Sequence, residues 1–218
     1  MSARRAPGFF ITLEGIEGVG KTTQLKRLSC ALSARAVSHV VTREPGGTPL
    51  AEQIRMLVLG AGEEVVPDVA ELLLVFAARS VHLENFIEPN LAAGYWVLCD
   101  RFTDSTYAYQ GGGRGLQEPA IRSLERLVQG QRRPDLTLLI DVPVALGLER
   151  ATRQRAAAGR SADRFDAQRA EFFERVRAMY LERLAAEPDR IALIDGRPDA
   201  EAVSAQILEV LRSRSWIP

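Results

Sequence analysis

Short runs of apolar and β-branched residues alternate with longer amphipathic stretches along the whole chain. The short runs predict strands at 8–14, 37–42, 95–100, 136–142 and 191–195. The longer stretches predict helices from residue 20, over 49–59, 68–93 and 118–129, from residue 144, over 166–186 and at the C-terminal end. Because the connections are too long for hairpins, the pattern predicts an α/β fold: a five-stranded parallel sheet with helices on both faces.

The composition favours one globular domain over 1–218, since 46% of the 218 residues are hydrophobic and no internal repeat or linker interrupts them. Lys+Arg and Asp+Glu are both 28, so no net charge draws the chain to nucleic acid or to an anionic membrane. Neither a secretory signal nor a membrane span is recognisable, and Cys30 and Cys99 are expected to be reduced core thiols. We therefore expect a cytoplasmic protein without nucleic-acid or membrane partners.

The clearest chemical signal follows the first predicted strand. Residues 15–22 read GIEGVGKT and match the phosphate-binding pattern G-x-x-x-x-G-K-[ST], placed as required between a strand and a helix. Glycines let backbone N–H groups turn inward around anionic oxygens, and the helix N-terminus adds its positive dipole end. We expect this P-loop and the first helical turn to bind a nucleoside triphosphate through Gly15, Ile16, Glu17, Gly18, Val19, Gly20, Lys21, Thr22 and Thr23.

Within the P-loop, Lys21 is expected to reach the β- and γ-phosphates, and the Thr22 hydroxyl is expected to bind Mg²⁺. An acidic metal partner is expected at the end of another strand, where Asp100 and Asp141 are the candidates. We favour Asp100, because Arg101 follows it and would bring a guanidinium to the same place. Asp141 also fits the position of a helix cap.

Arginines indicate a second anionic ligand. Arg55, Arg79 and Arg101 each follow an apolar segment and are suited to hold a phosphate bidentately. A lid is predicted at about 150–164, where positive charge would close over the triphosphate, with an ordinary basic helix face as the alternative. Its arginines are Arg150, Arg153, Arg155, Arg160 and Arg164. This set favours a small-molecule kinase over a P-loop protein that switches conformation without a small acceptor.

Ordered motifs along essentially the whole chain resemble those of the bacterial thymidylate kinases, P-loop nucleoside monophosphate kinases that convert dTMP to dTDP with ATP. The motifs are LEG at 13–15 with Glu17 after it, TREPGGT at 42–48, FAAR at 76–79, DRF at 100–102, YAYQGGGRG at 107–115 and RPDLT at 133–137. The resemblance implies a P-loop kinase fold with a lid, ATP and Mg²⁺ as cofactors, and a homodimer. The nearest alternative is another nucleoside monophosphate or deoxynucleoside kinase of the same architecture.

The resemblance also implies roles for the residues of the acceptor side. Arg55, Arg79 and Arg101 would hold the dTMP phosphate. Thr106 and Gln110 would bind the polar edges of thymine, and Phe76, or else Val75, would face its ring. Glu17 would bind the 3′-hydroxyl or its water network, and Tyr109 would pack against the sugar and disfavour ribonucleotides.

The catalytic groups that the resemblance implies are Lys21, Arg101, Glu17 and a lid arginine. Members of this kind place their catalytic arginine in the lid, and the P-loop here carries Glu17 and no arginine. Arg153 is our first choice, with Arg155 and Arg160 as alternatives, and Arg150 is expected to contact ATP.

Overall fold

The computed structural model describes residues 8–60, 64–158 and 170–218. Its strands form one sheet in the order β2-β3-β1-β4-β5, and every pairing is parallel. The strands are β1 (Phe10–Glu14), β2 (His39–Arg43), β3 (Trp96–Asp100), β4 (Leu136–Asp141) and β5 (Ile191–Asp195). The predicted five-stranded parallel sheet is therefore confirmed.

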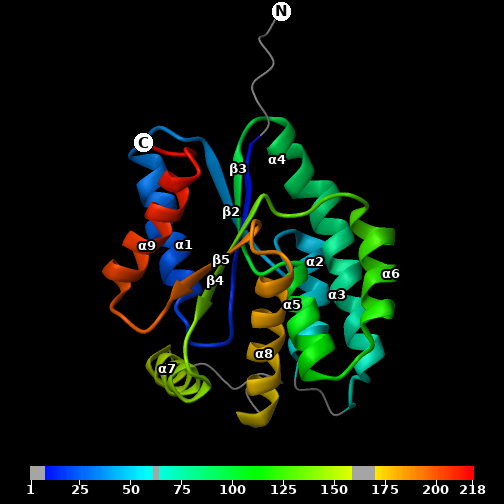
Figure 1. Ribbon diagram of the computed structural model, residues 1–218. Coiled ribbons are helices and arrows are strands. Elements are labelled where there is room, and N and C mark those ends of the chain that lie inside the picture. The colour runs from blue at the N-terminus through cyan, green and yellow to red at the C-terminus, as the bar shows by residue number, and fades with distance from the viewer. Residues whose placement is uncertain (1–7, 61–63, 159–169) are drawn as a thin grey trace, which may run out of the picture.

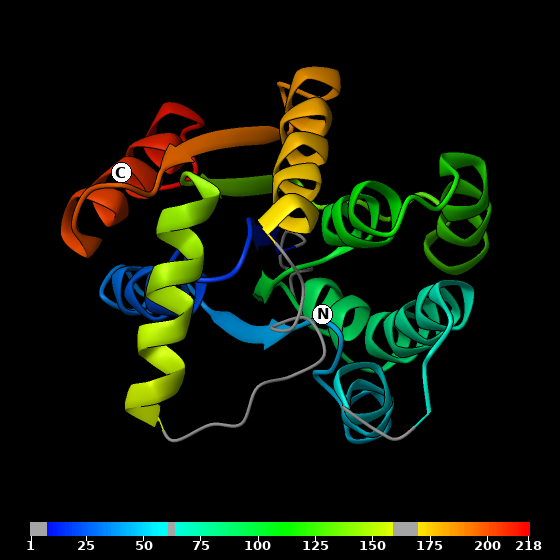
Figure 2. The same ribbon diagram turned by 90° about the horizontal axis from the view of Figure 1, so that it is seen from below.

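Helices cover both faces of the sheet (Figure 1). One face carries α1 (Lys21–Ser33) and α9 (Ala200–Ser213), which pack against each other. The other face carries α3 (Asp68–His82), α6 (Glu118–Gln129) and α8 (Ala170–Ala186), with α2 (Pro49–Leu59) packed outside α3. Seen from below, α7 (Val144–Ala158) lies beside the P-loop end of the sheet, across from α2 (Figure 2). The carboxyl ends of the strands thus open into a space bordered by α7 and α2.

Two helical regions differ from the sequence prediction. The helix expected over 68–93 is interrupted after α3 by a π-helical turn, η1 (Leu83–Ile87), before α4 (Glu88–Ala92). The segment after β3, for which no element was predicted, forms α5 (Thr103–Thr106) and a π-helix, η2 (Tyr107–Gly113). Its glycines argue against a helix by propensity, but a Cβ at Gly113 would lie 2.5 Å from the Phe172 ring, so close packing against α8 requires them.

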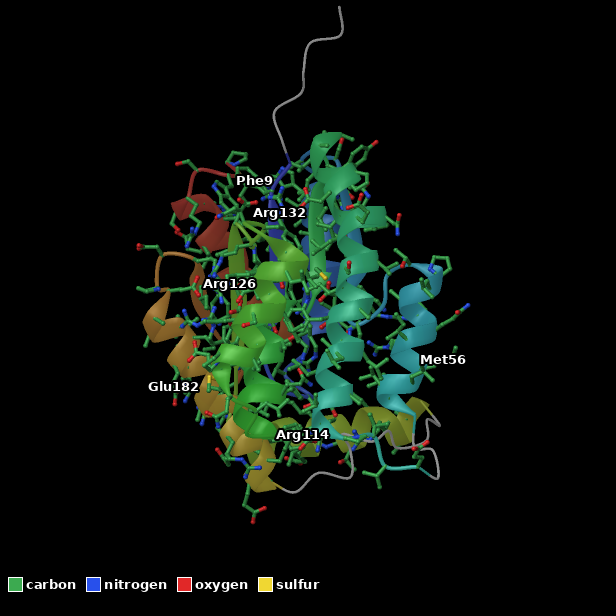
Figure 3. The ribbon with its side chains drawn as sticks, turned by 90° about the vertical axis from the view of Figure 1, so that its right-hand side faces the viewer. Phe9, Met56, Arg114, Arg126, Arg132 and Glu182 are labelled. Atoms are coloured by element: carbon green, nitrogen blue, oxygen red, sulfur yellow. The ribbon has the colours of Figure 1, made fainter. Side chains whose placement is uncertain are left out.

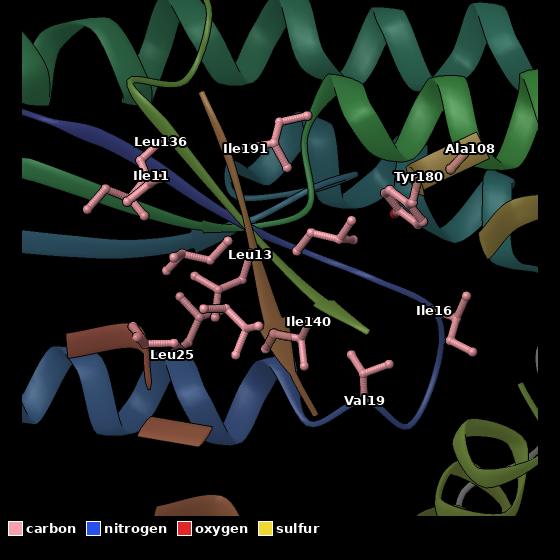
Figure 4. Close-up of a cluster of buried hydrophobic side chains, with 14 of the residues drawn as sticks. Ile11, Leu13, Ile16, Val19, Leu25, Ala108, Leu136, Ile140, Tyr180 and Ile191 are labelled. Carbon is pink, nitrogen blue, oxygen red and sulfur yellow. The ribbon is translucent and has the colours of Figure 1, made fainter. Parts of the chain in front are cut away.

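The main core extends over both faces of the sheet, and part of it lies between the sheet and α1. Figure 4 shows Leu13 and Ile140 from the sheet facing Leu25 of α1, with Val19 of the P-loop beside them. Of the two cysteines, Cys99 is buried as expected, whereas Cys30 lies on the exposed side of α1, so that part of the prediction was wrong. None of the helices in the described part of the chain has both the length and the hydropathy of a membrane span.

Candidate active site

The P-loop connects the end of β1 to the first residue of α1, Lys21, as the sequence predicts. Ile16 and Val19 anchor it, since both side chains are buried in the core. Gly18 has a φ of +75°, and a Cβ there would lie 1.9 Å from the carbonyl oxygen of Gly147 in α7. A Cβ at Gly147 would in turn lie 2.8 Å from the carbonyl oxygen of Glu17. The loop and α7 therefore touch backbone to backbone, which only glycine permits.

The buried Lys21 side chain is hydrogen-bonded to the backbone of the P-loop itself. Its Nζ donates to the carbonyl oxygens of Gly15 at 2.9 Å and Ile16 at 2.8 Å. Burial, with the nearby Arg101 guanidinium adding to it, lowers the pKa of Lys21 to about 8. The only lysine besides Lys21 is Lys26, which lies exposed on α1. Lys21 thus carries the ammonium available to phosphates bound in this loop.

Thr22 and Asp100 meet beside the loop. Thr22 Oγ1 donates to Asp100 Oδ2 at 3.3 Å, and Thr22 and Thr23 are both exposed at the first turn of α1. Asp141, the alternative acid, forms a bidentate ion pair with Arg177 through bonds of 2.7 and 2.8 Å. Only Asp100 of the two candidates therefore adjoins the threonine hydroxyl.

Arg101 connects the P-loop to the acceptor side. It has a φ of +72° directly after β3, and its guanidinium donates to the Gly15 carbonyl oxygen at 3.0 Å and to Glu17 Oε1 at 3.1 Å. It also donates to the Tyr109 hydroxyl at 2.9 Å, and this hydroxyl donates to both Glu17 oxygens at 2.8 Å. The structure thus brings Glu17, Arg101 and Tyr109 into one hydrogen-bonded cluster, as expected for groups sharing a ligand.

A buried carboxylate that sequence reasoning missed holds the turn carrying Arg101. Glu14 accepts from the Phe102 backbone N–H at 2.7 Å, from Ser105 Oγ at 2.5 Å and from the Tyr180 hydroxyl at 2.8 Å. Burial, with the charge of Asp104 adding to it, raises the pKa of Glu14 to about 7. The available signal was a charged residue ending a strand that is otherwise apolar and buried.

Arg79 lies deep beneath the acceptor side, with 1% of its surface exposed. Its Nε donates to Glu44 Oε2 at 2.7 Å and its Nη2 donates to Thr106 Oγ1 at 2.9 Å. Glu44 also lies 3.0 Å from His82 Nδ1, and neither residue was singled out from sequence. Among the described residues, Arg79 Nη1 is one of two buried side-chain atoms that lack a hydrogen-bond partner. A fixed donor is therefore left available to a ligand.

Val75 rather than Phe76 lines the cavity of this site. Glu71, Val75 and Arg79 repeat every fourth residue of α3 and so share one face. Phe76 is turned away, is 2% exposed and packs with Leu72, Tyr107 and Ile121 in a separate cluster. The structure does not bring the expected stacking ring into the site, because one helical position changes the direction of a side chain by about 100°.

The helix α7, in which the predicted lid begins, directs its arginines differently from our first choice. Arg153 pairs with Glu149 on the exposed side of α7, whereas Ala151, Gln154 and Arg155 line the cavity. Arg150 donates to the carbonyl oxygens of Gly196 at 2.7 Å and Arg197 at 3.0 Å, holding the loop between β5 and α9. Arg160 and Arg164 lie outside the described residues. Helical periodicity thus favours Arg155 over Arg153.

One cavity of about 390 Å³ joins these groups. At one end it is lined by Gly18 and Lys21 of the P-loop, and at the other by Arg79, Thr106 and Gln110. Its remaining polar lining includes Arg55, whose Nη1 donates to the Pro45 carbonyl oxygen at 2.8 Å, and Asp100, Arg101 and Tyr109. A phosphate cradle and a second pocket therefore open into the same space, as phosphoryl transfer between two ligands requires.

Known proteins share this sequence and fold. The family model described as thymidylate kinase matches residues 13–207. The thymidylate kinase of Pseudomonas syringae pv. syringae (strain B728a) is 53% identical over 212 residues, covering 94% of this chain and 99% of its own. That of Chromohalobacter salexigens is 54% identical over 213 residues, covering 96% and 99%.

A solved structure agrees with the sequence matches. The crystal structure of thymidylate kinase from Ehrlichia chaffeensis superposes with a TM-score of 0.74 at 34% identity, covering 94% of this chain and 100% of its own. The sequence match therefore extends to the fold and to nearly the full length of each protein. The chain belongs to the thymidylate kinase family, the enzymes that phosphorylate dTMP to dTDP.

Proposed function

We propose that the protein transfers the γ-phosphoryl group of ATP directly and in line to the phosphate of dTMP inside this cavity. The observation that carries the proposal is that Lys21 of the cradle and Gln110 of the second pocket line the same cavity. The acceptor phosphate is largely a dianion at neutral pH, because its second pKa is about 6. No general base is needed, so catalysis reduces to positioning and charge neutralisation.

The cationic side chains have different roles in positioning the two nucleotides and neutralising their charge. Lys21 neutralises the triphosphate, and Arg101, which reaches both the P-loop and Glu17, screens the repulsion between donor and acceptor phosphates. Arg55 lines the cavity beside Arg101 and holds the dTMP phosphate with it. Arg155 replaces Arg153 as the described lid arginine that supports the transferring group, since it alone of the two lines the cavity.

Thr22 and Asp100 would hold Mg²⁺. A hydroxyl and a single carboxylate in contact suit this small hard cation, which commonly takes one or two protein oxygens and completes its shell with phosphates and water. The described residues contain no group of three or more metal-binding side chains, which fits a metal that arrives with the nucleotide. Bound there, Mg²⁺ would neutralise charge on the phosphate oxygens.

Arg79 is better suited to the thymine base than to the dTMP phosphate. Its charge is already balanced by Glu44 at 2.7 Å, and its guanidinium is also tied to Thr106, a residue expected at the base. The Nη1 group that lacks a partner within the described chain would donate to a carbonyl oxygen of the pyrimidine. The ring itself would lie against Val75.

The sugar fits between these regions. Tyr109 is bonded at 2.8 Å to Glu17 of the P-loop, and both line the cavity that also includes Arg79 and Gln110. Glu17 would accept from the 3′-hydroxyl, and the Tyr109 ring would occupy the space that a 2′-hydroxyl requires. This arrangement favours deoxyribonucleotides over ribonucleotides.

A coupled assay of ADP release across dTMP, dUMP, dCMP, AMP and thymidine tests this function. We expect dTMP to give the highest kcat/KM. Equal or higher rates with AMP would favour a different nucleoside monophosphate kinase, and hydrolysis of ATP at a rate independent of all five acceptors would favour a nucleotide switch.

A homodimer is the partner that the outer helical face favours. Apolar side chains on α2 and α3 remain largely exposed, and they include Met56 at 67%, Leu57 at 60%, Val69 at 58% and Leu73 at 51%. Figure 3 shows Met56 on α2 directed away from the rest of the molecule. A contiguous apolar face is typical of an association surface. Light scattering on the parent and on Leu57→Glu, expected to give a dimer and a monomer, tests this assignment.

A further inference from the structure

A buried carboxylate lies behind one of the residues expected to read the base. Glu71 has no exposed surface and lies in the first turn of α3. Its Oε1 accepts from Gln110 Nε2 at 2.6 Å, and its Oε2 accepts from Arg114 Nη2 at 3.1 Å. Arg114 lies where the lower ends of α3 and α6 come together (Figure 3). The guanidinium and the helix N-terminus both favour the ionised form of this carboxylate.

An ionised carboxylate determines which way the Gln110 amide points. The oxygen and nitrogen of a glutamine amide have nearly the same shape, so a half-turn exchanges an acceptor for a donor at little steric cost. Glu71 only accepts hydrogen bonds, so it binds the NH₂ group of Gln110 and would repel its oxygen at 2.6 Å. Gln110 lines the cavity, and its Oε1 is therefore held as the acceptor that a ligand meets.

Arg79 supplies a fixed donor that lines the same cavity as this fixed acceptor. Glu44 and Thr106 bind its Nε and Nη2, which leaves Nη1 as a donor without a partner in the described chain. Thymine and uracil present an acceptor at O4 and a donor at N3–H, and both groups match. Cytosine presents an amino donor and an N3 acceptor at these positions, so both of its groups would meet a like partner.

We infer that Glu71 is a positioning residue that sets base selectivity, because it locks the Gln110 amide in the orientation that accepts from a keto pyrimidine and rejects an amino pyrimidine. The inference rests on the proposed placement of thymine beside Arg79 and Gln110. A buried polar group left facing the wrong partner is a strong means of rejection. Selectivity is thus set by a residue that does not itself touch the nucleotide.

The variant Glu71→Gln tests the inference. A glutamine at position 71 keeps the shape but offers both a donor and an acceptor, so the Gln110 amide is free to turn. We expect the ratio of kcat/KM for dCMP to that for dTMP to rise about ten- to one-hundred-fold. The ratio for dUMP to dTMP should stay unchanged, since uracil has the same hydrogen-bonding edge as thymine.

Glu125→Gln is the matched control. Glu125 is also a buried carboxylate, accepts from the Tyr107 hydroxyl at 2.5 Å and pairs with Arg133 at 3.2 Å, but it does not line the cavity. The same chemical change there should leave the substrate ratios at the parent values. Each ratio compares two substrates on one sample, so a loss of folded enzyme does not alter it.

An unchanged dCMP ratio in Glu71→Gln, or an equal fall for dTMP, dUMP and dCMP, would overturn the inference. If Glu71→Gln does not fold, Gln110→Leu decides, because it retains the Glu71 pair with Arg114 but removes the oriented amide. Arg79 remains in that variant, so a partial preference for dTMP is expected, but a dTMP-to-dCMP ratio of kcat/KM equal to that of the parent would also overturn the inference. A parent enzyme inactive on dTMP would instead reject the proposed function itself.

Discussion

The proposed ATP end of the cavity, at the P-loop, and the proposed dTMP end, at Arg79 and Gln110, are built from different parts of the chain. At the ATP end, glycines shape a loop of backbone amides, and a single ammonium bonds to the loop's own carbonyl oxygens. At the dTMP end, buried ion pairs such as Arg79 with Glu44 fix the direction of side chains. Phosphate is recognised by any ring of donors, whereas a base edge requires donors and acceptors in fixed places. The first end is therefore recognised from one short motif whose chemistry is evident, whereas the motifs of the second end are recognised only by resemblance to a family.

The largest expected effect is at the ATP end. Lys21→Ala should lower kcat by at least about a thousand-fold, because the buried ammonium is lost and no second lysine lies nearby to replace it. Steady-state ADP release measures the loss. Lys26→Ala removes the only other lysine, which is exposed on α1, and should retain the parent rate. Similar losses in both variants would contradict the role of Lys21.

Arg101, which joins the two ends, comes next. Arg101→Ala should lower kcat by about a hundred- to a thousand-fold while ATP still binds, because the charge between the two phosphates is removed and the P-loop remains. Rapid-quench kinetics with calorimetric titration of ATP separates the two effects. The exposed Arg122, paired with Glu118, gives the control Arg122→Ala. A kcat comparable to that of the parent would remove Arg101 from the transfer step.

A smaller effect is expected at the dTMP end alone. Arg79→Met keeps much of the side-chain length but loses the Nη1 donor, so the KM for dTMP should rise about ten- to one-hundred-fold. The KM for ATP should stay at the parent value, since Glu44 keeps its contact with His82 and the P-loop is untouched. Equal changes in both KM values would indicate general loss of structure rather than loss of base binding.

The smallest effect is a pH dependence of ATP affinity. The pKa of Lys21 is lowered to about 8, and bound phosphates favour its charged form, so above pH 8 ATP binding must take up a proton. Calorimetry should show a Kd about ten-fold higher at pH 9 than at pH 7. Burial of the charged Lys21 side chain lowers the free energy of unfolding at pH values below 8. This cost falls between pH 8 and 10.5, the ordinary pKa of lysine, because the native side chain loses its proton in that range. A Kd independent of pH would contradict this account.

The same contrast explains how far the sequence predicts the structure. The spacing of hydrophobic residues, together with the glycines and prolines between them, is enough to predict the five strands, α2 at 49–59 and α6 at 118–129. The P-loop is predicted from its motif. The helices of 103–113 could not be predicted, because their glycines are needed only by packing against α8. Propensity is local, whereas this requirement comes from a distant segment.

Side-chain direction was the second limit. The choice of Phe76 over Val75 relied on residue type, and nothing in the sequence separated Arg153 from Arg155, whereas the structure decides both by helical face. Glu14 and Glu71 do not line the cavity and Glu44 does, but the partners of all three are brought to them by the fold. The four-residue spacing of Glu71, Val75 and Arg79 along α3 places them on one helix face. Nothing in the local sequence distinguishes that face from an ordinary buried one.

The glycine contact between the P-loop and α7 has a mechanical consequence. Gly18 and Gly147 allow the two backbones to touch with no flexible side chain between them, so a shift of one is passed directly to the other. Any movement of the loop on binding a triphosphate would therefore be passed to α7, which carries Arg155. Binding of the triphosphate would thus help to place the helix whose arginine contacts it. A Gly147→Ala substitution would disturb this backbone contact while leaving every charged group in place.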